Sequence, residues 1–212
     1  MRVLITGANR GIGAELASLY ANAGDTVLST SRAGQDGCTK LDVTDQASVV
    51  SAAQSMDAPI DVLICNAGVF LDRGQSLEDG FAPDLWADTF AANVTGVFTT
   101  IQAFLPKLQD GSKIAIIASQ MGSSARAGGR SYIYRSSKAA AANLAANLAV
   151  DLKPRGIAVG AYHPGWVITD MGGSDAAVTV QASAAGLVTR FAQLNLDTTG
   201  CFETFDGQVM PY

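Results

Sequence analysis

Short runs of apolar residues alternate with longer stretches of helical hydrophobic period along the whole chain. The short runs predict about seven strands, at positions 3–6, 26–30, 40–43, 61–65, 113–118, 157–162 and 201–205. The longer stretches predict helices at positions 14–23, 46–56, 83–94, 96–108, 133–152 and 179–194. Thr44 is the predicted cap of the second helix, and Pro154 and Gly156 end the fifth. The pattern therefore predicts an α/β protein.

The predicted strands are apolar and rich in β-branched residues, so they are expected to be buried on both faces. Strands of that kind form parallel sheets that helices cover, and strand–helix alternation gives the doubly wound arrangement. We expect one Rossmann-like domain over residues 1–212, with a parallel sheet of about seven strands and helices on both faces.

Composition and charge narrow the classes of function. With 212 residues, 48% of them hydrophobic, the chain is long enough to bury one sizeable core. Its net charge of -5 argues against a nucleic-acid partner, because no basic stripe is available to neutralise phosphates. Cys38, Cys65 and Cys201 lack the spacing of metal ligands, so no metal site is expected. The apolar run after Met1 and Arg2 is too short for a leader or a membrane span, which predicts a cytoplasmic protein without a membrane partner.

Glycines recur between the first predicted strand and the first predicted helix, from Thr6 to Gly13. A dinucleotide-binding fold needs glycines at this point for a sharp turn, for close approach to a pyrophosphate and for tight helix packing. The helix N-terminus adds free N–H groups and a partial positive charge. A plain glycine-rich turn is the alternative, but the position between strand and helix favours a cofactor site.

The end of the second predicted strand distinguishes the two nicotinamide cofactors. NAD sites usually place an acidic residue there for the ribose hydroxyls, whereas NADP sites accommodate a phosphate. Here the strand ends at Ser31 and Arg32 without an acid, and Arg10 lies in the glycine loop. Guanidinium groups bind phosphates through paired hydrogen bonds. Solvated surface charges are the alternative for each arginine, but together they favour NADP(H), with NAD(H) as the alternative cofactor.

Tyr134 and Lys138 are four residues apart at the start of the fifth predicted helix, which places both side chains on one face. A phenol with its ordinary pKa near 10 is a poor base at neutral pH. A neighbouring ammonium group stabilises the phenolate and is expected to lower that pKa. Tyr134 would then exchange a proton with an alcohol or carbonyl oxygen. A surface pair that arises by chance is the alternative.

Taken in order, these motifs resemble the short-chain dehydrogenase/reductase family over nearly the whole chain. The loop from Thr6 to Gly13 is similar to the TGxxxGxG loop of that family. Asn66-Ala67-Gly68 is similar to its NNAG motif, with Cys65 in place of the first asparagine. The segments 163–173 and 202–211 are similar to the C-factor and sniffer-type carbonyl reductases within it.

The resemblance implies a set of site residues. It assigns a catalytic tetrad to Asn93, Ser119, Tyr134 and Lys138. It also extends the predicted cofactor contacts, which are Gly7, Asn9, Arg10, Gly11, Ile12, Gly13, Ser31, Arg32, Asp42, Val43, Asn66, Ala67, Gly68, Tyr134, Lys138, Pro164, Gly165, Val167 and Thr169. Local structure is the preferred interpretation of His163, and helix capping competes with an adenine contact for Asp42.

The resemblance further implies an NADPH-dependent oxidoreductase that transfers a hydride between the cofactor and a small ketone, aldehyde or secondary alcohol. Tyr134 would act as the acid or base, Ser119 would orient the carbonyl, and Asn93 would hold a water that connects Lys138 to solvent. A nucleotide-binding sensor or signalling protein with little turnover is the alternative; the complete tetrad favours catalysis. A sugar-nucleotide epimerase is disfavoured because its loop spacing and length differ.

The remaining expectations concern the pocket and the assembly. Few residues lie between Met171 and the last predicted helix, and they are small, which predicts an open pocket with loose selectivity. The large apolar candidates for its walls are Phe70, Trp86, Met121 and Trp166; each could equally belong to the core, and for Trp86 the core is the preferred interpretation. The alanine-rich stretch 139–149 serves either internal helix packing or the subunit interface that the family commonly has, and a homodimer or homotetramer is expected.

Overall fold

Seven strands form one sheet in the computed structural model, which describes all residues, 1–212. The strands are β1 (Arg2–Ile5), β2 (Thr26–Ser31), β3 (Thr39–Lys40), β4 (Ile60–Cys65), β5 (Leu108–Ile117), β6 (Ala158–His163) and β7 (Phe202–Thr204). The α-helices are α1 (Gly11–Asn22), α2 (Gln46–Gln54), α3 (Pro83–Phe90), α4 (Gly96–Phe104), α5 (Tyr132–Leu152) and α6 (Val180–Gln193). One π-helical turn, η1 (Ala91–Thr95), and four 3-10 turns, η2 (Leu105–Lys107), η3 (Gln120–Gly122), η4 (Ser124–Arg126) and η5 (Lys153–Arg155), join them.

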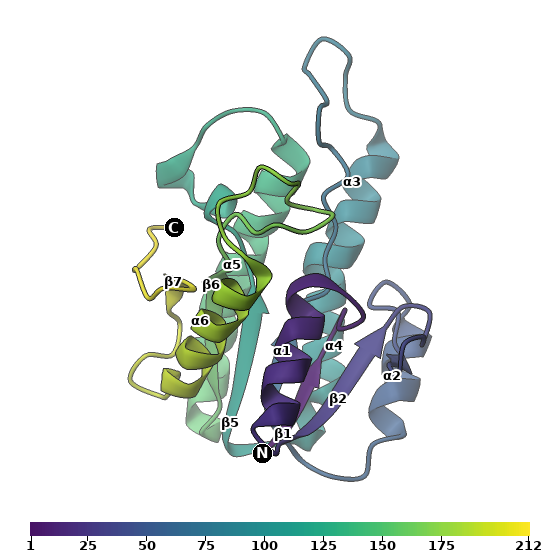
Figure 1. Ribbon diagram of the computed structural model, residues 1–212, viewed down its shortest axis with the longest axis vertical. Coiled ribbons are helices and arrows are strands. Elements are labelled where there is room, and N and C mark those ends of the chain that lie inside the picture. Colours follow the sequence, from purple (N-terminus) through teal and green to yellow (C-terminus); the bar gives the residue numbers. More distant parts are fainter.

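The strands lie in the order β3-β2-β1-β4-β5-β6-β7, and every neighbouring pair is parallel. The chain winds outward from β1 to β3 and then crosses back, so that β4 pairs with β1 on its other side. The carboxyl ends of the strands point toward the upper end of Figure 1, where the long connections gather. Doubly wound sheets bind ligands at this edge, beside the point where the strand order reverses. The predicted fold is confirmed.

Helices cover both faces of the sheet, with α1 and α6 in front and α2, α4 and α5 behind in Figure 1. The alternation of side chains along β1 divides the core accordingly. Val3 and Ile5 are buried against Leu16 of α1, whereas Leu4 belongs to the larger cluster that includes Ile101 of α4. Burial of both faces is the reason for the unbroken apolar runs in the sequence.

The alanine-rich helix α5 packs within the chain. Its buried small residues, Ala141, Ala142, Ala145 and Ala149, belong to the larger core cluster. Side chains of this size allow the helix backbone to lie close to the sheet, and Lys138 is thereby brought beside the end of β5. Internal packing therefore accounts for these four alanines.

Several predicted boundaries were wrong, for local reasons. The strand predicted at 40–43 ends at Lys40, because the Asp42 carboxylate accepts hydrogen bonds from the Thr44 N–H (2.9 Å) and hydroxyl (2.7 Å) and turns the chain. The cap of α2 is Asp45 rather than Thr44, and it accepts from the Ala47 N–H at 2.9 Å. The helix predicted at 83–94 is regular only to Phe90, where the π-helical turn begins.

Candidate active site

The predicted cofactor residues lie together at the carboxyl edge of the sheet. One group forms the β1–α1 connection and the first turn of α1, from Gly7 to Gly13. The others follow the remaining strands: Ser31 and Arg32 at the end of β2, Asp42 and Val43 after β3, Asn66, Ala67 and Gly68 after β4, and Pro164, Gly165, Val167 and Thr169 after β6. The fold therefore brings together segments that are far apart in the sequence.

Asn66 joins β4 to the glycine loop. Its side-chain amide donates to the backbone oxygens of Thr6 (3.0 Å) and Gly7 (2.9 Å). Gly13 packs against this junction, because a Cβ at its position would lie 2.3 Å from the Gly7 oxygen and 2.6 Å from the Asn66 side-chain nitrogen. Asn66 and Gly13 therefore fix the path of the loop.

The first turn of α1 presents backbone N–H groups that no side chain caps. Arg10 occupies the cap position without a side-chain hydrogen bond to the helix, and the first turn holds no acidic residue. The leading N–H groups of the helix consequently lack a side-chain acceptor, and they carry the positive end of the helix dipole. These features fit the pyrophosphate of a dinucleotide.

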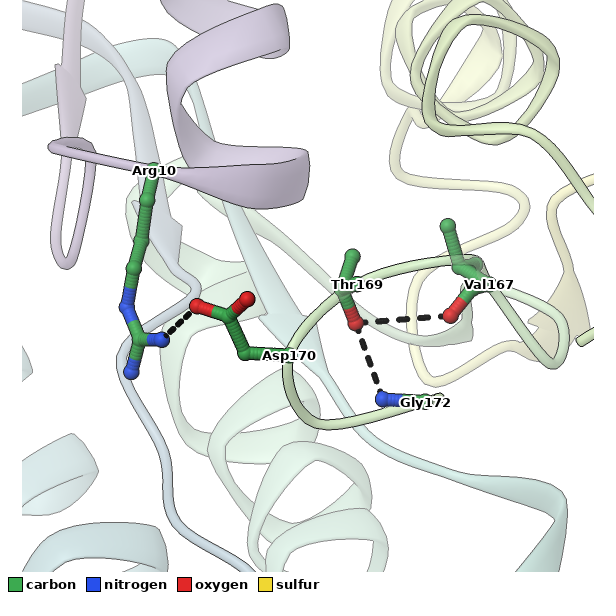
Figure 2. Close-up of polar contacts among 5 residues, drawn as sticks. All are labelled: Arg10, Val167, Thr169, Asp170 and Gly172. Atoms are coloured by element: carbon green, nitrogen blue, oxygen red, sulfur yellow. Dashed lines mark hydrogen bonds and ion pairs between the residues drawn. The ribbon is translucent and has the colours of Figure 1, made fainter. Parts of the chain in front are cut away.

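Arg10 connects this loop to the segment that follows β6, as Figure 2 shows. Its guanidinium forms an ion pair with Asp170, and both side chains are exposed. The segment is folded back by Thr169, whose hydroxyl accepts from the Gly172 N–H (3.0 Å) and donates to the Val167 oxygen (3.3 Å). Arg10 is therefore engaged by Asp170 in this structure, whereas the Arg32 side chain lies exposed after β2.

Lys138, Tyr134 and Ser119 meet at the end of β5. Lys138 and Tyr134 are buried on α5, and the Lys138 ammonium donates to the Ile117 oxygen at 2.7 Å. Ser119 follows β5 as the cap of η3, and its hydroxyl accepts from the Met121 N–H at 3.1 Å. Ser119 lies close enough to the Tyr134 phenol to lower its pKa. The three side chains form one buried polar cluster.

The predicted lowering of the Tyr134 pKa by Lys138 is not what the structure shows. Burial raises the pKa of Tyr134 to about 12, although the polar Ser119 side chain and the charge of Arg73 act in the opposite direction. The Lys138 ammonium lies 5.8 Å from the centre of the Tyr134 ring and points to the Ile117 oxygen. Burial also lowers the pKa of Lys138, to about 8. Desolvation is therefore the largest cause of both pKa shifts.

Asn93 lies in the π-helical turn between α3 and α4. Its amide oxygen accepts from the Val69 N–H (2.8 Å), and its amide nitrogen donates to the Val69 oxygen (2.9 Å) and the Ser137 hydroxyl (3.0 Å). The side chain thus holds the β4–α3 connection against α5. Turns of this type interrupt α-helices frequently at functional sites.

Sequence reasoning missed Asp72, whose carboxylate is completely buried. It accepts hydrogen bonds from the N–H groups of Ile133 (2.9 Å) and Tyr134 (3.3 Å), at the start of α5. Ser131, the residue at the cap position, has a left-handed backbone and supplies no side-chain hydrogen bond. Asp72 therefore caps α5 from a distance of about sixty residues along the chain. Local sequence patterns carry no signal for a cap of this kind.

A cavity of about 300 Å³ opens beside Tyr134 and Ser119. Three of the predicted wall residues, Phe70, Met121 and Trp166, line it; Trp86 does not and instead stacks on Phe90, with ring centres 6.1 Å apart. Phe70 stacks on Tyr134 itself, with ring centres 4.2 Å apart. The cavity thus joins an apolar wall to the buried polar cluster.

His163 also lines the cavity. The residue is buried and its Nδ1 atom has no hydrogen-bond partner. Burial, together with the charge of Arg126, lowers the pKa of His163 to about 4. The imidazole is therefore neutral at physiological pH and adds no charge to the cavity.

No group of three or more potential metal-ligating side chains of His, Cys, Asp or Glu occurs in the structure. None of its helices combines the length and the apolar character that crossing a membrane requires.

Proteins of similar sequence belong to one family of dehydrogenases or align with this chain over most of its length. A family model described as short chain dehydrogenase matches residues 1–178. The C-signal of Myxococcus xanthus is 38% identical over 157 residues, which cover 73% of this chain and 93% of that protein. The 1-hydroxy-2-glutathionyl-2-methyl-3-butene dehydrogenase of a Rhodococcus species is 32% identical and aligns over 99% of both chains.

Solved structures agree as well. The NADPH-bound carbonyl reductase from chicken fatty liver superposes with a TM-score of 0.89 at 28% identity, over 100% of this chain and 98% of that chain. The carbonyl reductase Sniffer of D. melanogaster gives a TM-score of 0.88 at 26% identity, over 100% and 99% of the two chains. Fold and site define a Rossmann-type oxidoreductase. The chain belongs to the short-chain dehydrogenase family.

We predict that Asp72→Ala lowers the free energy of unfolding by about 2–3 kcal/mol, because two N–H groups at the start of α5 lose a charged acceptor. Urea denaturation followed by circular dichroism measures the change. The control is Asp57→Ala, which removes an exposed carboxylate and is expected to change stability by less than about 0.5 kcal/mol. Equal losses in both variants would contradict the capping role.

We predict that His163 titrates near pH 4 in the folded protein, below its ordinary pKa of 6.5. Because it is the only histidine, its ring resonances in a proton NMR titration are unambiguous. Between pH 6.5 and 4 the unfolded chain binds this proton and the folded chain does not, so its contribution to stability falls as the pH is lowered. A midpoint near 6.5 in the folded state would contradict burial of the ring.

Proposed function

We propose that the protein is an NADPH-preferring carbonyl reductase that interconverts small ketones or aldehydes with their alcohols. The observation that carries the proposal is the meeting of Lys138, Tyr134 and Ser119 beside a cavity with an apolar wall. When bound, the reduced nicotinamide cofactor supplies the hydride for the substrate carbonyl. The free N–H groups at the start of α1 and the exposed Arg32 would hold its phosphates.

In this proposal Tyr134 donates its proton to the carbonyl oxygen during reduction. A phenol whose pKa is about 12 is protonated at neutral pH, which suits a proton donor. Ser119 donates a hydrogen bond to the same oxygen and orients it. Lys138, with its pKa near 8, would return the proton to Tyr134 through neighbouring hydrogen bonds, while Asn93 keeps the surrounding segments in place.

The name C-signal of one relative gives a reason to weigh a second function, a nucleotide-dependent signalling role without turnover. The buried polar cluster favours catalysis, because binding a nucleotide does not require a tyrosine, a lysine and a serine at one point beside a cavity.

We also propose a homodimer or homotetramer, supported by the exposed apolar side chains of Phe98 on α4 and Val150 on α5.

We expect Tyr134→Phe to lower kcat for carbonyl reduction by about 10²–10⁴-fold, because the phenylalanine ring has no proton to donate. The assay follows loss of reduced-nicotinamide absorbance against a panel of ketones and aldehydes. Tyr132→Phe is the matched control, since Tyr132 packs edge-on against Phe81 and lies outside the cavity lining. A wild-type protein that binds NADPH but reduces no carbonyl would favour the signalling role instead.

We expect Arg32→Ala to raise the KM for NADPH about tenfold and to change the KM for NADH less than twofold, because only NADPH carries the phosphate that a guanidinium would bind. Steady-state kinetics with both cofactors measures the ratio. Arg155→Ala serves as the control, because Arg155 lies in η5, at the end of α5 opposite to Tyr134. Equal changes for both cofactors would identify Arg32 as a surface charge.

A further inference from the structure

The cavity beside Tyr134 carries a single fixed charge. Of the residues that line it, only Arg73 is charged, and no aspartate or glutamate is among them. His163 is neutral at physiological pH because of its burial. A protein with a net charge of -5 thus has a positively charged cavity next to its candidate acid.

Arg73 has no carboxylate partner. The ion pairs of the structure join Met1 to Asp25 and Arg10 to Asp170. The neighbouring Asp72 directs its carboxylate to the start of α5. One terminal nitrogen of Arg73 donates to the Met171 oxygen, which steadies the side chain against the segment after β6. A guanidinium has five N–H donors, so most remain available to a ligand.

Arg73 is also close to the reacting group. Its guanidinium lies over the Phe70 ring, 5.0 Å from the ring centre, and Phe70 stacks on Tyr134. The Arg73 charge acts on Tyr134 strongly enough to oppose the rise in its pKa. An anionic group attached near a carbonyl would therefore meet Arg73 when the carbonyl oxygen meets Tyr134.

We infer that Arg73 binds a carboxylate of the substrate, and that the preferred substrates are keto acids with an apolar body. The inference rests on the proposed carbonyl reduction and specifies its substrate class. The apolar body would lie against Phe70, Met121 and Trp166, which line the same cavity. The loose selectivity expected from the sequence is thereby narrowed, because neutral ketones leave the guanidinium without a partner.

The reaction balances without another reactant. The carbonyl carbon gains a hydride, with its two electrons, from the reduced nicotinamide, and the carbonyl oxygen gains the proton of Tyr134. The keto acid becomes a hydroxy acid, the nicotinamide is oxidised, and Tyr134 recovers a proton from solvent. The carboxylate is unchanged, so Arg73 is a binding residue that contributes to specificity.

Benzoylformate and its methyl ester provide a direct test, because the ester removes the charge beside the keto carbon and adds only a methyl group. We expect Arg73→Gln to lower the acid-to-ester ratio of kcat/KM about tenfold, mainly through KM for the acid, which is the effect of one lost charged hydrogen bond. Arg73→Lys is expected to keep the ratio within threefold of wild type. Arg155→Gln, with the same change of net charge at the far end of α5, is expected to leave it unchanged.

Binding of benzoate and benzamide, measured by calorimetry, separates this inference from the proposed function. We expect Arg73→Gln to weaken benzoate binding about tenfold and benzamide binding less than twofold, in wild type and in Tyr134→Phe alike. If the wild-type protein reduces no carbonyl compound but its benzoate binding still depends on Arg73, only the carbonyl reductase proposal is overturned. An unchanged acid-to-ester ratio, or equal losses for acid and ester, would overturn the role of Arg73.

Discussion

The candidate site depends on how the first turn of α5 is held against the sheet. Asp72 accepts the N–H groups of Ile133 and Tyr134, and its burial makes this charged contact the replacement for a conventional cap. The chain enters the helix through Arg130 and Ser131, both with left-handed backbone, an arrangement that costs on the order of 1 kcal/mol per residue. The Asp72 contact offsets that cost and fixes the position of Tyr134.

The same connection after β4 contributes three neighbours of different kinds to the tyrosine. Phe70 covers its ring, Asp72 binds its backbone, and Arg73 supplies a charge at the cavity wall. Asn93 holds the beginning of this connection through the backbone of Val69. The position and the electrostatics of Tyr134 are therefore set largely by residues that precede α5 by about sixty positions.

Desolvation dominates the electrostatics at this point. Burial keeps the Tyr134 phenol protonated and lowers the pKa of Lys138. The helical spacing of the two residues had instead predicted that Lys138 would lower the Tyr134 pKa. The Lys138 side chain turns to the Ile117 oxygen because a buried ammonium group requires an acceptor. Burial also lowers the pKa of His163 and keeps its imidazole neutral. The cavity consequently owes its charge to Arg73 alone among its lining residues.

The sequence by itself determined the doubly wound sheet and the glycine loop, because hydrophobic period and short motifs are local properties. Helical spacing pointed to Tyr134 and Lys138 as a pair, and the family resemblance added Ser119. The sequence did not determine the distant cap by Asp72, the engagement of Arg10 by Asp170, the π-helical turn at Asn93 or the direction of the Tyr134 pKa. These features arise between segments brought together by folding, and desolvation exists only once the core has formed. The tertiary structure alone therefore decided which charge lines the cavity.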